Sequence, residues 1–210
     1  MAAPIVIVGA GQAAASFVSR HVALGSHQPV LLIGDEAHPP YQRPPLSKKY
    51  LLGELERERL FIRPLEWYAD QAVELRFDTR VDSIDRELKK IITNHGETVE
   101  YDKLLLCTGA SARSLPADIG GTLDRVFTLR SIADIDKMAP EFKADRKLLI
   151  VGGGYIGLEA AAASRKLGLE VTVLEMADRI LQRVAAAETS NYFRDLHSGH
   201  GVDLRESVRV

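Results

Sequence analysis

Leu148–Glu175 reads LLIVGGGYIGLEAAAASRKLGLEVTVLE, and this stretch decides the fold. Its apolar beginning, Leu148–Val151, is typical of a strand that is buried on both faces. A glycine-rich turn follows and leads into an alanine-rich helix. A second apolar strand then ends at the acidic residue Glu175. The order of these segments predicts a β-α-β unit.

The glycine-rich turn has the G-x-G-x-x-G spacing of a dinucleotide site. Gly152 permits the tight turn, Gly154 lets the backbone approach a pyrophosphate, and Gly157 lets the helix pack close to the strand. The start of the helix presents free N–H groups and a partial positive charge to the phosphates. Glu175 lies 23 residues after Gly152, where an acid accepts hydrogen bonds from ribose hydroxyls. An ordinary βα turn with tolerated glycines is the alternative interpretation.

A second copy of this pattern stands at the N-terminus. It consists of a strand, two glycines, an alanine in place of the third glycine, a second strand and an acidic pair: Ile5–Val8, Gly9 and Gly11, Ala14, Leu31–Ile33, and Asp35 with Glu36. Two such units, 143 residues apart, predict two nucleotide sites on one chain. One tightly held and one exchangeable dinucleotide is the simplest pairing, and it indicates hydride-transfer chemistry.

The composition excludes several classes of protein. The chain has 210 residues, 46% apolar and 27% charged, with a net charge of −2, which gives no basic excess for nucleic-acid binding. No apolar run reaches a transmembrane length, and the apolar N-terminus lacks the basic residues of a signal peptide. The single cysteine, Cys107, excludes a dithiol mechanism within these residues and favours a cytoplasmic location.

The segments outside the two glycine turns predict smaller elements. We expect an antiparallel meander of three strands at Arg80–Asp85, Lys89–Thr93 and Val99–Tyr101, followed by a buried strand at Lys103–Cys107. A short strand is expected at Val126–Arg130 and a helix capped by Ser131 at Ser131–Ala139. The last expected elements are a helix at Glu188–Ser198 and a strand at Val202–Leu204. The proline-rich loop at 37–51 is expected to start a short helix around Lys48–Leu52. Arg43 and Lys48 make this loop either a cofactor clamp or a solvated basic loop.

The motifs resemble those of the FAD-dependent, NADH-using ferredoxin reductases of the putidaredoxin reductase type, which serve bacterial cytochrome P450 and aromatic-ring dioxygenase systems. The matching stretches are IVIVGAGQAA, LLIGDE, PYQRPPLSKKYL, YDKLLLCTGA, TLRSIAD, LLIVGGGYIGLE and VTVLEMADRIL. PYQRPPLSK combined with the two glycine motifs is the most specific part.

This resemblance implies an α/β fold with two Rossmann-like units, the two-dinucleotide-binding flavoprotein fold, and a small antiparallel β meander. Residues 1–112 are expected to form the first segment of an FAD-binding domain, and residues 113–210 an NAD(H)-binding domain. A doubly wound sheet needs more strands than the second unit supplies, so that domain is expected to be incomplete, truncated at the C-terminus.

The resemblance also implies the site residues. Those expected to bind FAD are Gly9, Gly11, Ala13, Ala14, Asp35, Glu36, Arg43, Lys48, Val81, Thr108, Gly109 and Arg130. Those expected to bind NADH are Gly152, Gly154, Tyr155, Ile156, Gly157, Glu159, Glu175 and Arg183. Lys48, near the reactive end of the flavin, and Glu159 are the candidate catalytic residues. Glu175 favours NADH because a carboxylate repels the 2′-phosphate of NADPH, although Arg179 or Arg183 could meet such a phosphate.

The implied activity passes a hydride from NADH to FAD and then single electrons to a [2Fe–2S] ferredoxin that serves an oxygenase. Neither a nucleic-acid nor a membrane partner is expected, and the oligomeric state stays open. Two alternatives remain: a truncated, non-catalytic nucleotide-binding remnant, and a related NADH-dependent flavoprotein such as a nitrite reductase subunit or an NADH oxidase. The PYQRPPLSK loop, which has no cysteine near it, argues against the second of these.

Overall fold

The structure is a computed structural model that describes residues 3–209. Its contacts divide the chain into two compact units. The first unit contains the residues up to Gln42 together with Arg57–Ser111, and the second contains Arg43–Glu56 together with the residues from Ala112 onward. Segment 43–56 therefore belongs to the second unit, and the chain passes between the units three times. The assignment of FAD and NAD(H) to residues 1–112 and 113–210 stays a prediction.

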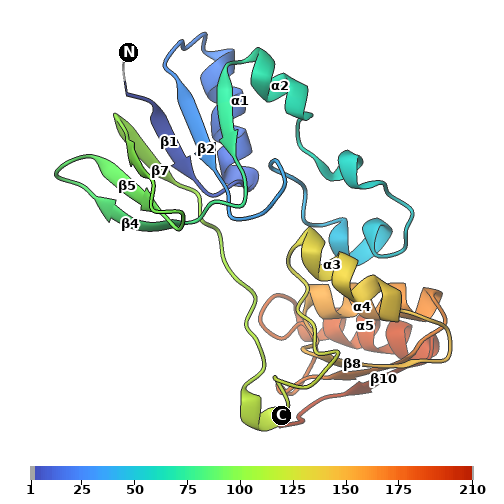
Figure 1. The fold of residues 1–210 in the computed structure, drawn as a ribbon. Coiled ribbons are helices and arrows are strands. Elements are labelled where there is room, and N and C mark those ends of the chain that lie inside the picture. The colour runs from blue at the N-terminus through green and yellow to red at the C-terminus, as the bar shows by residue number, and fades with distance from the viewer. Residues whose placement is uncertain (1–2, 210) are drawn as a thin grey trace. The chain divides into compact units, whose positions relative to one another are not determined.

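The first unit is built on a four-stranded parallel sheet with the order β3-β2-β1-β7 (Figure 1). Its strands are β1 (Ile5–Val8), β2 (Val30–Ile33), β3 (Val73–Arg76) and β7 (Lys103–Leu106). Helix α1 (Gln12–Ala23) joins β1 to β2, and the 3-10 turn Arg57–Leu60 and helix α2 (Leu65–Asp70) precede β3. The register pairs Val8 with both Ile33 and Leu106, so the three strands end at the same level.

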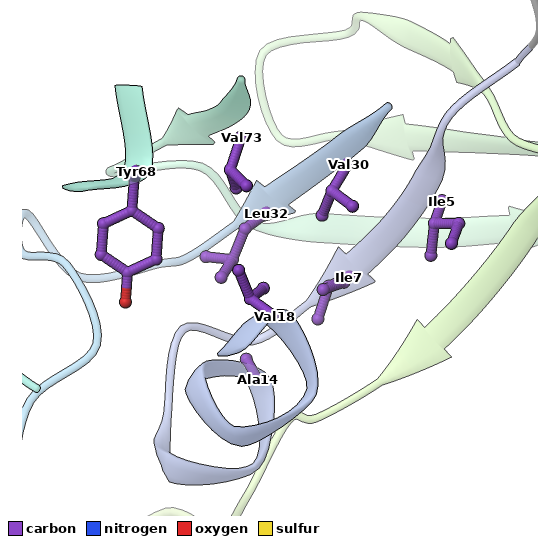
Figure 2. Close-up of a cluster of buried hydrophobic side chains, with 8 residues drawn as sticks. All are labelled: Ile5, Ile7, Ala14, Val18, Val30, Leu32, Tyr68 and Val73. Atoms are coloured by element: carbon purple, nitrogen blue, oxygen red, sulfur yellow. The ribbon is translucent and has the colours of Figure 1, made fainter. Parts of the chain in front are cut away.

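Both faces of this sheet are covered, because successive side chains of a strand point to opposite faces. Ile5 and Ile7 of β1 pack with Val18 of α1 on one face, as Figure 2 shows. Val6 packs on the other face with Ile91 of an antiparallel meander. The meander strands are β4 (Val81–Asp85), β5 (Lys90–Thr93) and β6 (Thr98–Glu100), in the order β4-β5-β6. The predicted meander is confirmed.

The second unit contains a three-stranded parallel sheet with the order β10-β9-β8. Its strands are β8 (Lys147–Val151), β9 (Glu170–Leu174) and β10 (Val202–Arg205), and its helices are α3 (Ile132–Met138), α4 (Tyr155–Lys166) and α5 (Ala187–Gly199). A π-helical turn at Leu46–Tyr50 packs against α3 and α4, and short 3-10 turns lie at Ala117–Ile119 and Ala139–Glu141. Ser131 caps α3, as predicted, and the structure adds a reciprocal bond: the Asp134 carboxylate accepts from the Ser131 N–H.

One prediction for β8 is wrong, because this strand is not buried on both faces. Leu148 and Ile150 pack toward Ala161 of α4, whereas Leu149 and Val151 are 59% and 45% exposed. The meander of the first sheet has no counterpart on this sheet among residues 3–209. One face of the sheet therefore stays open over the described chain.

Three smaller predictions also differ from the structure. The predicted buried strand Lys103–Cys107 ends at Leu106, which is 58% exposed because β7 lies at the edge of its sheet. Residues 126–130, all described, form a loop and not a strand. The Arg130 backbone is used otherwise: its N–H donates to Asp134 Oδ2 and its carbonyl accepts from Arg43. The helix expected around 48–52 begins earlier, at Leu46.

Candidate functional site

The first glycine turn joins the end of β1 to α1. Gly9 adopts φ +104°, and a Cβ atom there would lie 2.2 Å from the carbonyl oxygen of Cys107, so only glycine fits between the strand ends. Gly11 precedes the first residue of α1, and no side chain of the described residues caps this helix. A Cβ atom on Gly11 would meet nothing within 4 Å in the described part of the chain. The N-terminus of α1 is therefore open to an anion.

Three other predicted FAD residues of the first unit, Asp35, Glu36 and Thr108, lie at the same edge of the sheet. Asp35 follows β2 and Thr108 follows β7, at the level where Gly9 follows β1. Asp35 and Thr108 are exposed, whereas Glu36 accepts a hydrogen bond from the Tyr41 hydroxyl at 2.5 Å. Asp35 is thus the acid that stands at the surface beside the turn.

The remaining FAD residues of this unit differ in their surroundings. Ala14 is fully buried in the core between α1 and the sheet, where it takes the place of the third glycine. Ala13 lies next to it in the first turn of α1. Gly109 is exposed with φ +66°, and Val81 is half-buried at the start of β4. Burial raises the pKa of the nearby Cys107 thiol, which keeps it in the neutral form.

The second glycine turn repeats this arrangement between β8 and α4. Gly152 adopts φ +113°, and a Cβ atom on Gly157 would lie only 2.0 Å from the Gly152 carbonyl oxygen. Gly154 precedes the helix, and a Cβ atom there would meet nothing within 4 Å over residues 3–209. Gly157 therefore serves close packing, while Gly154 faces open space at an uncapped helix start within that range.

Glu175 folds back onto this turn. Its carboxylate accepts hydrogen bonds from the backbone N–H of Gly153 at 2.7 Å and from that of Ala177 at 2.8 Å. Two backbone donors thus fix the acid beside the glycines. Arg179 donates to Ala185 O at 2.9 Å and to Ser190 Oγ of α5 at 2.6 Å, while Arg183 is exposed.

A cluster of charged side chains forms where segment 43–56 packs within the second unit. Lys48 Nζ lies 2.7 Å from Glu159 Oε2 and 3.1 Å from the carbonyl of Pro44. Arg43 Nη1 donates to the carbonyl of Arg130 at 2.7 Å, and Arg130 Nε is buried with no hydrogen-bond partner among the described residues. An unpaired buried guanidinium nitrogen is costly, so it is expected to meet an acceptor that binds there.

These side chains line a cavity of about 280 Å³. Its lining residues are Arg43, Pro44, Leu46, Ser47, Lys48, Leu129, Arg130, Ile156 and Glu159. Five of the predicted site residues are therefore brought together here. Sequence reasoning missed Ser47, which is 3% exposed, and the only sequence signal for it was its place inside the PYQRPPLSK motif.

A larger cavity, of about 670 Å³, lies between α4 and α5. Leu158, Leu181 and Phe193 line it with other apolar side chains, and His197 also lines it. Burial, together with the neighbouring His200, lowers the pKa of His197. Of the predicted site residues, Tyr155 and Glu159 reach this cavity.

No group of three or more His, Cys, Asp or Glu side chains is placed to hold a metal ion between residues 3 and 209. None of the helices described there has the length and apolar character that crossing a membrane requires.

The family model of the pyridine nucleotide-disulphide oxidoreductases matches residues 3–210, nearly the whole chain. The chain belongs to this family. A similar relative is the ferredoxin reductase subunit of 5,5′-dehydrodivanillate O-demethylase from a Sphingobium species, 42% identical over 97% of the chain and 49% of the relative. Putidaredoxin reductase of Pseudomonas putida is 38% identical over 98% of the chain and 49% of the relative.

The solved structures agree with this assignment to the pyridine nucleotide-disulphide oxidoreductases. The crystal structure of the covalent putidaredoxin reductase–putidaredoxin complex matches with a TM-score of 0.94 and 37% identity, covering 99% of this chain and 50% of that one. The chain spans about half the length of the curated relatives it matches. The predicted resemblance and the two-dinucleotide-binding flavoprotein fold are confirmed.

Family membership and these relatives imply FAD and a pyridine nucleotide as cofactors. The residues present fit both. Each glycine turn leads into a helix whose N-terminus is uncapped within the described chain, as pyrophosphate binding requires. The buried Arg130 Nε, which has no hydrogen-bond partner among the described residues, could donate to a bound cofactor. The individual binding residues stay predictions, and so does the cytoplasmic location.

Proposed function

We propose that this protein is a ferredoxin reductase that passes electrons from NADH through FAD to a [2Fe–2S] ferredoxin serving a P450 or ring-hydroxylating oxygenase. The observation that carries this proposal is the fit of the whole described fold, at a TM-score of 0.94, to a putidaredoxin reductase joined to its putidaredoxin. The names of the similar ferredoxin reductases support it. When bound, FAD accepts a hydride and releases electrons singly, which couples a two-electron donor to a one-electron acceptor.

The residues of the first unit would hold the nucleotide part of FAD. The open N-terminus of α1, with Gly11 and Ala13, offers backbone N–H groups to the pyrophosphate. Asp35, exposed at the end of β2, is placed to accept hydrogen bonds from a ribose. Thr108 and Gly109 leave room for backbone to approach the cofactor closely.

The residues of the second unit would hold NADH and the reacting rings. The turn from Gly152 to Gly157 binds the second pyrophosphate, and Glu175 presents its charge beside that turn. A fixed carboxylate disfavours a 2′-phosphate, so we propose NADH as the preferred donor. Arg179, which could have offset this charge, already donates to Ala185 and Ser190.

Lys48 and Glu159 would act at the reacting end. Lys48 would supply a positive charge in the 280 Å³ cavity, which would stabilise the negative charge of a reduced cofactor bound beside it. Glu159 keeps the ammonium in place through the 2.7 Å contact. Neither residue serves as a nucleophile in this proposal.

The test is the visible absorption spectrum of the purified protein with FAD, recorded before and after NADH is added without air. We expect a bound-flavin spectrum that bleaches with NADH and far more slowly with NADPH. A [2Fe–2S] ferredoxin added next should be reduced, in proportion to the NADH consumed. A protein that stays colourless with FAD would contradict the proposal and support the non-catalytic alternative.

A further inference from the structure

We infer that Ser47 is a positioning residue, which holds the Glu159 carboxylate against Lys48 at the site of hydride transfer. The inference rests on the proposed function for its catalytic consequence, but not for its geometry. Ser47 Oγ donates to Glu159 Oε2 at 2.6 Å, and Lys48 Nζ contacts the same oxygen at 2.7 Å. One carboxylate oxygen therefore receives two neighbouring donors.

The backbone shows why adjacent residues can reach one oxygen. In a regular helix, residues i and i+1 point in directions about 100° apart and do not face a common partner. In the turn Leu46–Tyr50, however, the backbone at Lys48 departs from helical geometry, with φ −126° and ψ −112°. This break turns the side chains of Ser47 and Lys48 toward the same side, where α4 presents Glu159.

Burial separates the roles of the two donors. Lys48 and Glu159 side chains are 46% and 31% exposed, so their ion pair alone is weak and does not fix one geometry. Ser47 is 3% exposed and cannot exchange its partner for bulk water. A buried hydroxyl whose bond is directed at a carboxylate is the stronger constraint. Ser47 thus sets where Glu159 points, and Glu159 sets where the Lys48 charge stands.

The chain offers a matched control for this geometry. Lys166 Nζ lies 2.5 Å from Glu54 Oε1, and these side chains are 62% and 43% exposed. Like the Lys48–Glu159 pair, this pair joins segment 43–56 to α4, yet Ser47 does not touch it. A change that only loosens the segment would disturb both pairs, whereas loss of the Ser47 bond should disturb one.

The experiment compares the parent protein with Ser47→Ala after treatment with a carbodiimide, which joins neighbouring amines and carboxylates into amides that mass spectrometry locates. We expect the parent to give both the Lys48–Glu159 and the Lys166–Glu54 amide. Ser47→Ala should lose most of the first and keep the second. An undiminished Lys48–Glu159 amide would overturn the inference, and loss of both amides would assign Ser47 a merely structural role.

Stopped-flow reduction of the FAD-loaded protein by NADH tests the consequence. We expect Ser47→Ala to lower the limiting rate about tenfold, the factor that corresponds to one lost hydrogen bond to a charged group, with half-saturation by NADH nearly unchanged. In a Glu159→Gln background the same substitution should have no further effect. An additive effect would overturn the inferred route through Glu159. If the parent is not reduced by NADH at all, the proposed function fails, while the two amides still decide the positioning of Glu159.

Discussion

Replacing Gly157 with alanine should destabilise the second unit, whereas the same change at Gly154 should not. The added methyl group at Gly157 would lie 2.0 Å from the Gly152 carbonyl oxygen and 3.4 Å from Ile150 Cγ2. The obstructing atom belongs to the backbone, so the turn itself must move, and we take the upper end of the overpacking range, about 3 kcal/mol. The better helix propensity of alanine returns at most about 1 kcal/mol. The free energy of unfolding should fall by about 2 kcal/mol.

Gly154→Ala is the matched control in the same turn. Its methyl group would enter open space, with nothing within 4 Å among residues 3–209, so only a small capping preference is lost, about 0.5 kcal/mol. That open space is where a pyrophosphate would approach, so this variant should bind NADH at least tenfold more weakly while it stays folded. Urea denaturation followed by circular dichroism gives the stability, and NADH titration gives the affinity. Equal denaturation midpoints for the two variants would refute the packing argument.

Three further predictions follow from single side chains. Tyr68→Phe should leave stability unchanged or raise it by up to about 1 kcal/mol, because the buried hydroxyl has no partner in the described chain. Burial also raises the pKa of Tyr68 to about 12. The control Tyr101→Phe, which loses a hydrogen bond to a carbonyl, should lower stability in the same urea titration. The pKa of His197 is lowered in the folded protein, so the unfolded chain binds this proton more readily. The melting temperature should therefore fall as the pH drops below 6.5. The His197→Asn variant should show a smaller fall over the same pH range. Lys48→Ala should slow flavin reduction by NADH about tenfold or more while changing stability by less than about 1 kcal/mol; an unchanged bleaching rate would contradict it.

The parts of the fold that depend on local pattern could be predicted from the sequence. The glycine spacing located both β-α-β units, and the positive φ of Gly9 and Gly152 follows from the turn that each must make. Asn94–Gly96 has the sequence of a hairpin turn, and it joins β5 to β6 in the meander. In each of these cases the deciding interaction lies within a few residues of the pattern.

The parts that depend on distant partners could not be predicted. Leu148–Val151 is uniformly apolar, and this pattern does not indicate which side chains will be covered. In the described part of the chain no layer covers Leu149. Arg130 sits in an extended apolar stretch, but its backbone groups bond to Asp134 and Arg43, which takes it out of any strand. The hydrogen bond from Ser47 to Glu159 joins residues 112 positions apart. It depends on the break in helical geometry at Lys48, which the residue types there do not predict.

The threefold passage of the chain between the units has a consequence for proteolysis. Residues 112–116, all exposed except the half-buried Leu115, form a connecting stretch without helix or strand, the kind of site where a protease cuts first. After a single cut there, segment 43–56 would stay covalently part of the N-terminal fragment, yet its Leu46 and Ser47 are buried in the unit that the C-terminal fragment forms. The two fragments of a nicked chain would therefore migrate together under native conditions and separate only in denaturant. An attempt to express the second unit from residue 112 onward would omit a piece of its own core.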